Sequence, residues 1–442
     1  MPPPTDLLSE AYAVLDANDR SAYTQPAAGL YPHQWLWDSC FIAIGLRHRD
    51  VQRAMVELSS LLRGQWSNGM LPNIIFSNDA SYARDRNVWR SWVNPHSPAD
   101  VSTTGITQPP MLAEAVVRVG EKLPPIERRS WYRKMYPSLV NYHRWLYNER
   151  DPHGEGLVLL IHPWEVGMDN TPPWMVELHE HQLSSWIRLI QKTHTDSIIK
   201  LFRRDTRQIP EGQRFDSIEA LAMFDILRRL RRKIYDIDRI LDHSLFAIED
   251  VAFNAILIRN NQQLVAIARY IKEQLPASLS SSMNQTKVAF EQLWDPFSAN
   301  YFSRDFITHR LLKESSVATM LALYAGTIPE ERARSLVSQL KDQHSFGSHF
   351  PVPTVPLNSV WFKPDNYWQG PTWVNINWLI IDGLKRYGFI EEAKELRQHT
   401  LEMITSFGCF EYFDPKDGHG LGVENFSWSA ALAIDLCLNP IL

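Results

Sequence analysis

The chain has very little cysteine. Its 442 residues include only Cys40, Cys409 and Cys437, with neither a CxxC pair nor the spacing of a metal site. So sparse and odd a set argues against a disulfide framework and for a reducing compartment. The N-terminus lacks the basic start and apolar run of a signal peptide, and no stretch approaches ~18 uninterrupted apolar residues. We therefore expect a cytoplasmic protein that does not bind a membrane.

An excess of charge of one sign is also absent. The formal net charge is −5, and the lysines and arginines are scattered rather than gathered into one face. We therefore expect no nucleic-acid partner. The GxSxG, P-loop, strand-linked GxGxxG and HExxH motifs are missing. His179 and His181 have no further ligand at a suitable spacing, so we expect neither a metal nor a cofactor.

Helical periodicity dominates what is present. Apolar residues recur at three- and four-residue intervals over 373–384 and again over 390–404, on either side of Tyr387-Gly388. Two amphipathic helices joined by so short a connection form an antiparallel hairpin. The same pattern predicts further helices at 41–62, 111–119, 127–147, 174–193, 215–239, 250–271, 288–294, 317–324, 330–340 and 427–438. We expect one all-α domain, residues 1–442, with repeated hairpins, few strands and at most a small cap subregion at about 195–245.

Long polar segments separate these helices, at 64–110, 150–173, 341–370 and 406–426. Loops of this length are uncommon unless they carry function. The chain also holds 16 tryptophans, 15 tyrosines and 19 phenylalanines. Aromatic rings match the C–H faces of sugars, although a large helical core would also use tryptophan as filler. The places where the aromatic residues cluster must decide between these interpretations.

The first cluster, residues 31–39, reads Tyr-Pro-His-Gln-Trp-Leu-Trp-Asp-Ser. Trp35 and Trp37, with Tyr31 nearby, form an aromatic rim around a single carboxylate, Asp38. This is the composition of a sugar subsite, in which Asp38 would accept hydrogen bonds from vicinal hydroxyl groups. The alternative is that Asp38 caps the helix that follows it.

The second cluster, residues 162–174, reads His-Pro-Trp-Glu-Val-Gly-Met-Asp-Asn-Thr-Pro-Pro-Trp. Prolines restrict the backbone on both sides of two carboxylates, Glu165 and Asp169, with Trp164 beside them. An acid that protonates a glycosidic oxygen needs a raised pKa, and aromatic walls that exclude water raise it. The alternative is that Asp169 or Thr171 caps the next helix.

The third cluster lies in residues 365–378, at a junction between a loop and a helix. Trp373 falls on the apolar face of that helix, so packing explains it as well as a ligand contact does. Tyr367, Trp368 and Gln369 lie outside the helix and are harder to explain by packing.

The fourth cluster places Glu411, Asp414, Asp417 and Glu424 in a glycine-rich loop before the last helix. The regular spacing of a calcium-binding EF-hand is absent, and Glu424 could cap the helix. Glu411 lies between aromatic residues, which suits a partly buried base. Carboxylates set in aromatic loops are what glycoside hydrolysis requires.

Taken together and in this order, the four clusters resemble the six-hairpin glycosidases, the clan of trehalases and processing α-glucosidase I. The likeness points in particular to the mannosylglycerate and glucosylglycerate hydrolases of glycoside hydrolase family 63. It extends from about Tyr31 to Leu438. The motifs that carry it are Trp35-Leu-Trp-Asp38-Ser39, His162-Pro-Trp-Glu-Val-Gly-Met-Asp169-Asn170, Tyr367-Trp-Gln-Gly-Pro371, and Glu411-Tyr-Phe-Asp-Pro415 with Asn425-Phe-Ser-Trp428.

The resemblance implies an (α/α)6 barrel and hydrolysis with inversion at the anomeric carbon. It assigns the general acid to Asp169 and the general base to Glu411 in preference to Glu424. Around the sugar and the aglycone it implies contacts from Tyr31, Trp37, Asp38, Tyr82, Gln108, Tyr367, Trp368 and Gln369. We add Trp35, Trp164 and Trp373 as expected substrate contacts.

The family holds a glycerate carboxylate with an arginine and a tyrosine that follow the acid loop. Arg203 and Arg204 offer the cation here, since a guanidinium suits a planar carboxylate. Residues 215–230 contain no tyrosine, which is a departure from the family's pattern.

We therefore expect an inverting exo-α-glycosidase that acts on a small α-glucoside or α-mannoside, such as glucosylglycerate or mannosylglycerate. One alternative is a trehalase-like α-glucosidase that hydrolyses a neutral disaccharide. Another is a carbohydrate-binding protein without catalytic activity on the same scaffold. In each case the partner is a small carbohydrate, and the sequence leaves a homo-oligomer open.

Overall fold

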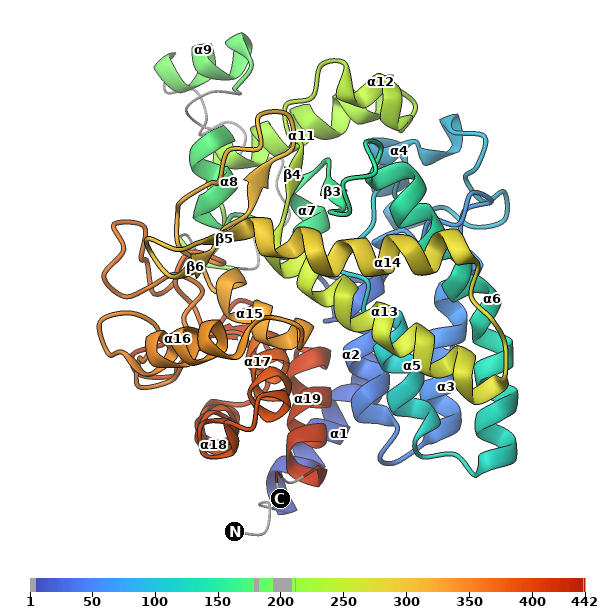
Figure 1. Ribbon diagram of the computed structural model, residues 1–442, viewed down its shortest axis with the longest axis vertical. Helices are drawn as coiled ribbons and strands as arrows, with labels where there is room; N and C mark the ends of the chain where they lie inside the picture. The colour runs from blue at the N-terminus through green and yellow to red at the C-terminus, as the bar shows by residue number, and fades with distance from the viewer. Residues whose placement is uncertain (1–4, 179–182, 194–208, 211, 440, 442) are drawn as a thin grey trace.

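In the computed structural model, twelve of the helices form two concentric rings. Figure 1 labels the helices of both rings. The structure describes residues 5–178, 183–193, 209–210, 212–439 and 441. The inner ring consists of α2 (Leu36–Leu46), α5 (Leu112–Gly120), α13 (Val251–Ile271), α15 (Ala318–Ala325), α17 (Val374–Arg386) and α19 (Ser427–Leu438). Each inner helix packs on the next, and α19 packs on α2, so the ring closes.

The outer ring covers the inner one. Its helices are α1 (Thr5–Asn18), α3 (Val51–Leu61), α6 (Pro125–Arg150), α14 (Ala277–Ala289), α16 (Glu330–Lys341) and α18 (Ile390–Phe407). Outer and inner helices alternate along the chain; each inner helix from α2 to α17 forms an antiparallel hairpin with the outer helix that follows it, and α19 packs on α1. The architecture is the expected all-α (α/α)6 barrel.

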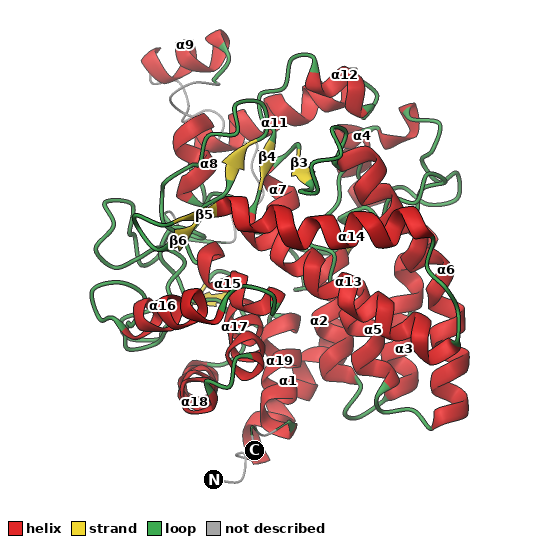
Figure 2. Cartoon of the chain, viewed as in Figure 1, coloured by secondary structure: helices red, strands yellow, loops and turns green. Residues whose placement is uncertain are grey.

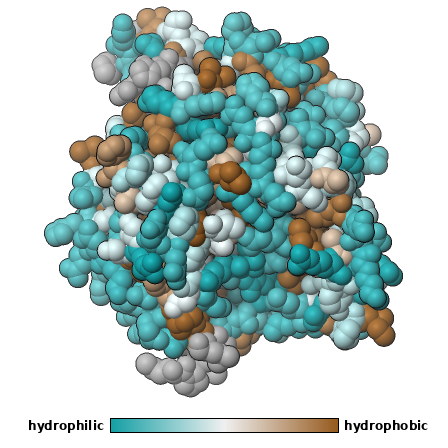
Figure 3. Space-filling model, viewed as in Figure 1, coloured by the Kyte–Doolittle hydropathy of each residue, from teal (hydrophilic) through white to brown (hydrophobic). Residues whose placement is uncertain are grey.

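The sequences of the two rings differ because their surroundings differ. Every residue of α2 and of α15 is buried, as an inner helix enclosed on all sides requires. An outer helix buries one stripe only, and in α16 that stripe is Ala333, Leu336, Val337 and Leu340. The opposite faces of the outer helices are polar, which fits the largely hydrophilic surface with scattered hydrophobic patches in Figure 3.

The two ends of the barrel carry connections of very different length. Inner helices lead to outer ones through the short turns 47–50, 121–124, 272–276, 326–329 and 387–389. Outer helices lead to inner ones through the segments 19–35, 62–111, 151–250, 290–317, 342–373 and 408–426. All the long segments therefore gather at the end where the inner helices begin.

Small elements brace these long segments (Figure 2). All the strand pairs are antiparallel. β1 (Gln34–Trp35) pairs with β2 (Ile74–Ile75), and β4 (Ile248–Glu249) lies between β3 (Leu159–Leu160) and β7 (Arg304–Asp305). β5 (Trp294–Asp295) pairs with β6 (Asn300–Tyr301), and β8 (Tyr412–Phe413) pairs with β9 (Gly420–Leu421). The short helices are α4 (Ala83–Trp89), α7 (Pro163–Val166), α8 (Pro172–Glu177), α9 (Ser185–Thr193), α11 (Ser217–Arg232) and α12 (Ile237–Leu241). The last two fall within the expected cap subregion, which stays a prediction.

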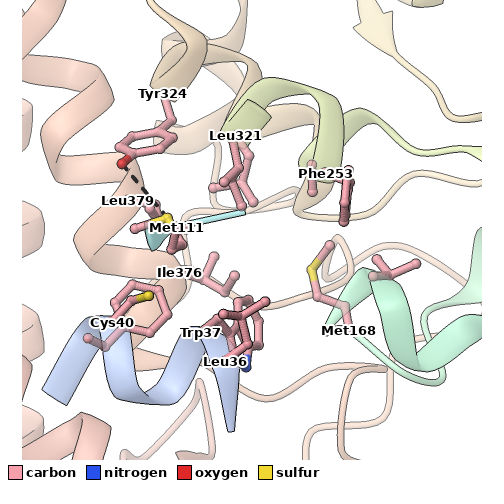
Figure 4. Close-up of a cluster of buried hydrophobic side chains, with 14 of the residues drawn as sticks. Leu36, Trp37, Cys40, Met111, Met168, Phe253, Leu321, Tyr324, Ile376 and Leu379 are labelled. Carbon is pink, nitrogen blue, oxygen red and sulfur yellow. Dashed lines mark hydrogen bonds between the residues drawn. The ribbon is translucent and has the colours of Figure 1, made fainter. Parts of the chain in front are cut away.

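The core lies directly beneath this end of the barrel. Figure 4 shows part of this core, a cluster of buried side chains that includes Leu36 and Trp37 of α2, Phe253 of α13, Leu321 of α15, Ile376 of α17 and Met168 of the acid loop. The three cysteines are free and buried. Among the described residues, no helix is both long and apolar enough to cross a membrane.

Candidate active site

A cavity of about 570 Å³ opens at the end of the barrel where the long segments gather. Ten of the residues expected from the sequence line it: Tyr31, Trp35, Trp37, Asp38, Gln108, Trp164, Asp169, Tyr367, Trp368 and Glu411. Trp428, from the motif Asn425-Phe-Ser-Trp428, also lines it, and residues that the sequence did not single out complete the wall, among them His33, Asp85, Trp89, Arg214 and Phe224. A cavity of this size suits a small ligand.

Asp38 lies in the first turn of α2 and lines the cavity. It does not cap the helix, because Trp35 holds the cap position and no side chain bonds there. Burial raises the pKa of Asp38 well above its ordinary value, and the nearby Glu411, Glu57 and Asp169 add to the rise. A buried carboxyl group without a capping role is available to hydroxyl groups of a ligand.

The two carboxylates of the acid loop have different surroundings. Glu165 is buried in an ion pair with Arg150, whose two terminal nitrogens donate at 2.9 and 2.8 Å. The backbone N–H groups of Ile161 and Thr107 also donate to Glu165, at 2.7 and 3.1 Å. Glu165 therefore holds the loop together and does not line the cavity, whereas Asp169 does.

Asp169 is half-buried, and its carboxyl group faces the cavity. It does not cap α8, since the cap position belongs to Thr171 and no side-chain bond forms there. The Tyr367 hydroxyl donates to its Oδ2 at 3.3 Å. Burial raises the pKa of Asp169 to about 7, against the lowering effects of Arg214 and Tyr367. Asp169 can therefore hold a proton near neutral pH.

Gly167 allows the acid loop to pass close to the aromatic wall. Its φ is 78°, and a Cβ atom there would lie 2.6 Å from the Trp37 ring. Gly154 has a similar φ of 65° with nothing within 4 Å of the same position, so it is a matched control.

We expect Gly154→Ala to lower the free energy of unfolding by about 1 kcal/mol, the cost of the left-handed backbone. Gly167→Ala should lower it by a further ~1–3 kcal/mol, because Trp37 must move. Urea denaturation of both variants measures the difference. Equal losses would contradict the close approach of Gly167 to Trp37.

Glu411 immediately precedes β8 and is the carboxylate of its loop that lines the cavity. The Tyr31 hydroxyl donates to its Oε1 at 2.8 Å, and Arg214 forms an ion pair with its Oε2. Burial raises the pKa of Glu411, while Arg214 and Tyr31 oppose the rise. Glu424, the rival candidate, is exposed and does not cap α19.

Arg214 is a functional candidate that the sequence analysis missed. Its guanidinium is buried over the Tyr367 ring, 4.3 Å from the centroid, and among the described residues its Nε has no partner. The preceding residue, Gln213, is hydrogen-bonded to the loop that carries Glu411. The Tyr412 hydroxyl donates to the Gln213 carbonyl, and the Gly422 N–H donates to Gln213 Oε1 at 3.1 Å. Arg203 and Arg204, the expected cations, lie outside the described residues.

The aromatic wall has two layers. Trp368 lines the cavity and stacks on Trp373 with centroids 3.6 Å apart and planes at 4°, and Trp373 stacks in turn on Tyr412. Trp373 therefore lies behind the wall and does not line the cavity. In front, Trp37 lines the cavity, and its backbone N–H donates to Gln108 Oε1 at 3.5 Å.

Tyr82, expected to contact the sugar, and Gln369, expected near the aglycone, also lie off the cavity wall. Tyr82 contacts the His33 ring edge-to-face at 5.0 Å. The Gln369 amide is buried and donates to the Asn170 carbonyl at 2.9 Å, so it ties its loop to the acid loop.

Within the described ranges, the group of side chains that could hold a metal ion is Asp414, Asp417 and His419. None of them lines the cavity, and two are exposed. Their loop geometry accounts for them, since Asp414 and Asp417 accept backbone N–H groups of the same turn.

Comparison with known proteins gives matches over nearly the whole chain. A family model described as a mannosylglycerate hydrolase MGH1-like glycoside hydrolase domain matches residues 31–429. A mannosylglycerate hydrolase of Thermus thermophilus is 38% identical, with 96% of this chain and 99% of the relative covered. A glucosylglycerate hydrolase of Mycolicibacterium hassiacum is 31% identical, with 98% of each covered.

Solved structures agree with this. A mannosylglycerate hydrolase of Thermus thermophilus, in complex with Tris and D-glycerate, has a TM-score of 0.86 at 37% identity. The superposition covers 97% of this chain and 99% of the other.

Proposed function

Because the chain belongs to the mannosylglycerate hydrolase MGH1-like glycoside hydrolase family, we propose that it hydrolyses a small α-glycoside of glyceric acid with inversion. The sugar is mannose or glucose. The observation that carries the proposal is the pair Asp169 and Glu411, a half-buried and a buried carboxyl group with different partners in one cavity. The raised pKa of Asp169 lets it hold a proton near neutral pH, whereas Glu411 is paired with the Arg214 cation.

In this reaction Asp169 donates its proton to the glycosidic oxygen as the bond to the anomeric carbon breaks. Glu411 takes a proton from a water molecule, whose oxygen attacks the same carbon from the opposite face. The products are the free sugar, with its anomeric configuration inverted, and glyceric acid. The two carboxyl groups then exchange protons with solvent to return to their starting states.

Sugar recognition follows from the residues of the cavity wall. Asp38 and Gln108 carry oxygen atoms that accept hydrogen bonds from sugar hydroxyl groups. Trp35 and Trp37 provide apolar faces against the C–H groups of the ring.

Arg214 supports an acidic aglycone. Its buried guanidinium lies over Tyr367, whose hydroxyl contacts Asp169, so it is close to the leaving group. A guanidinium binds a planar carboxylate through paired hydrogen bonds, and Arg214 lines the cavity. This favours glyceric acid over the neutral sugar of a disaccharide, and both named relatives are hydrolases of glycerate glycosides.

We test the proposal with four substrates: mannosylglycerate, glucosylglycerate, trehalose, and the glyceramide analogue of the better glycerate glycoside. We expect a glycerate glycoside to be hydrolysed best. The amide should lower kcat/KM by about 10- to 100-fold, because a hydrogen bond to a charged group is lost. NMR of the first product should give the β-anomer.

Three outcomes would contradict the proposal. Fastest hydrolysis of trehalose would favour the neutral-disaccharide alternative. Release of the α-anomer would refute inversion. Binding without turnover of any substrate would favour the carbohydrate-binding alternative.

A further inference from the structure

Three segments far apart in sequence meet behind the acid. They are the acid loop around Asn170, the loop that ends at Gln369, and the start of α11, which follows Arg214. A single buried side chain, Glu219, contacts all three. It does not line the cavity, and the proposed reaction gives it no role.

Both carboxylate oxygens of Glu219 are in use. Oε2 accepts the backbone N–H of Asp216 at 2.9 Å, which completes a capping box at the start of α11. Oε1 accepts from Gln369 Nε2 at 3.4 Å, the same nitrogen that donates to the Asn170 carbonyl. Glu219 therefore joins the helix that follows Arg214 to the residue that follows Asp169.

The same contact reaches the acid by a second route. Gln369 belongs to the loop that carries Tyr367, the hydrogen-bond donor to Asp169. The backbone N–H of the intervening Trp368 donates to Asn170 Oδ1 at 3.0 Å. Loss of the Glu219 carboxylate would thus loosen both the loop that carries the acid and the loop that donates to it.

Burial makes the Glu219 carboxyl group expensive to keep charged. Desolvation and Asp216 raise its pKa to about 7, while Lys363 and the Asn170 side chain act in the opposite direction. A helix cap alone does not require burial, because the partner in the same capping box, Asp216, is exposed.

We propose that Glu219 is a positioning residue for the general acid, holding Asn170 and Gln369 so that Asp169 meets the glycosidic oxygen. The inference rests on the proposed role of Asp169. It separates two tasks of one capping box: Asp216 caps the start of the helix, and Glu219 also positions the acid.

The test uses two substrates that differ in their need for an acid. The glycerate glycoside has an alkoxide leaving group and needs a full proton, whereas fluoride leaves an α-glycosyl fluoride of the same sugar with little proton transfer. We expect Glu219→Ala to lower kcat on the glycerate glycoside by about 10- to 100-fold, the range for lost support of a catalytic group. On α-mannosyl or α-glucosyl fluoride the change should stay within about 3-fold.

Asp216→Ala is the matched control, because it removes the other half of the capping box and leaves the contacts to Gln369 and Asn170. It should lower the thermal midpoint but leave the ratio of the two rates unchanged. Glu219→Gln replaces one accepting oxygen with an NH₂ group, so its rate ratio should lie between those of wild type and Glu219→Ala.

The positioning role would be overturned if Glu219→Ala lost the same factor in kcat on both substrates. It would also be overturned if Asp216→Ala changed the ratio of the two rates as much as Glu219→Ala does. Asp169→Asn distinguishes this from a failure of the proposed function. If Asp169→Asn loses activity on the glycerate glycoside only, while Glu219→Ala keeps that activity, then the inference about Glu219 is wrong and the assignment of the acid stands. If Asp169→Asn retains both activities, the assignment of the acid is wrong.

Discussion

An Asp169→Asn variant should lose about 10²–10⁴-fold in kcat on its glycoside, because an amide cannot protonate the leaving oxygen. Asparagine has nearly the same shape and can still accept from Tyr367, so the cavity should keep its form. The loss is measured by steady-state kinetics on the best glycerate glycoside. Activity above a tenth of wild type would refute Asp169 as the acid.

The pH dependence of the wild-type enzyme follows from the same group. Asp169 must hold its proton, and its pKa is raised to about 7, so kcat/KM should fall on the alkaline side with an apparent pKa near that value. Glu411 must be ionised, so activity should also fall at acid pH. A profile that stays flat above pH 7 would contradict the assignment.

Stability separates this loss of activity from misfolding. The pKa of Asp169 is higher in the folded protein than in the unfolded chain, so folding becomes less favourable as the pH rises from about 4 to about 7. At pH 8, Asp169→Asn should therefore be at least as stable as wild type. Glu165→Gln in the same loop should instead lose about 3–5 kcal/mol, because it leaves the Arg150 cation buried without a charged partner.

The barrel could be predicted because its hairpins are local. The periodicity over 250–271 fits α13, and the residue before it, Asp250, accepts the Phe253 N–H as a cap. The single helix predicted at 41–62 is wrong. The chain reverses at 47–50 between α2 and α3, where no glycine or proline marks the turn and only the cap at Asp50 signals it.

The helix predicted at 288–294 starts too late: α14 already runs from Ala277 to Ala289, and a 3-10 helix continues over Phe290–Leu293. The buried stripe of α14 is Leu279, Met283, Thr286 and Ala289, at the right spacing but too weakly apolar to give a periodic signal. Packing against α13 and α6 stabilises α14, whose local sequence gives only a weak helical signal.

Within the site, short motifs brought most of the expected residues to one cavity. Three of the motifs lead into the start of an inner helix, α2, α17 or α19, and the acid loop leads into α8 within the long segment before α13. Arg214 and Glu219 could not be found this way. Each acts across about 150–200 positions of sequence, on Glu411 and Gln369, and neither lies in an aromatic motif. The one local sign was the capping box formed by Asp216 and Glu219.

Glu411→Ala should lower kcat by about 10²–10⁴-fold, because it removes the base that takes the proton from the attacking water. It should also lower the free energy of unfolding by about 3–5 kcal/mol, since Arg214 is left as a buried cation without its partner. Added azide needs no base and fits the space left by the side chain. It should restore turnover and give the β-glycosyl azide, identified by NMR.

Glu424→Ala is the matched control, because Glu424 belongs to the same loop but is exposed and outside the cavity wall. Its activity and stability should equal those of wild type. If Glu424→Ala loses activity while Glu411→Ala keeps it, the base is misassigned. An α-glycosyl azide would mean that the nucleophile attacks the anomeric carbon from the same face as the leaving group, and the inverting mechanism would be refuted. Removing the stranded cation in Glu411→Ala/Arg214→Met should recover part of the lost stability without recovering activity, because packing is restored and the base is not.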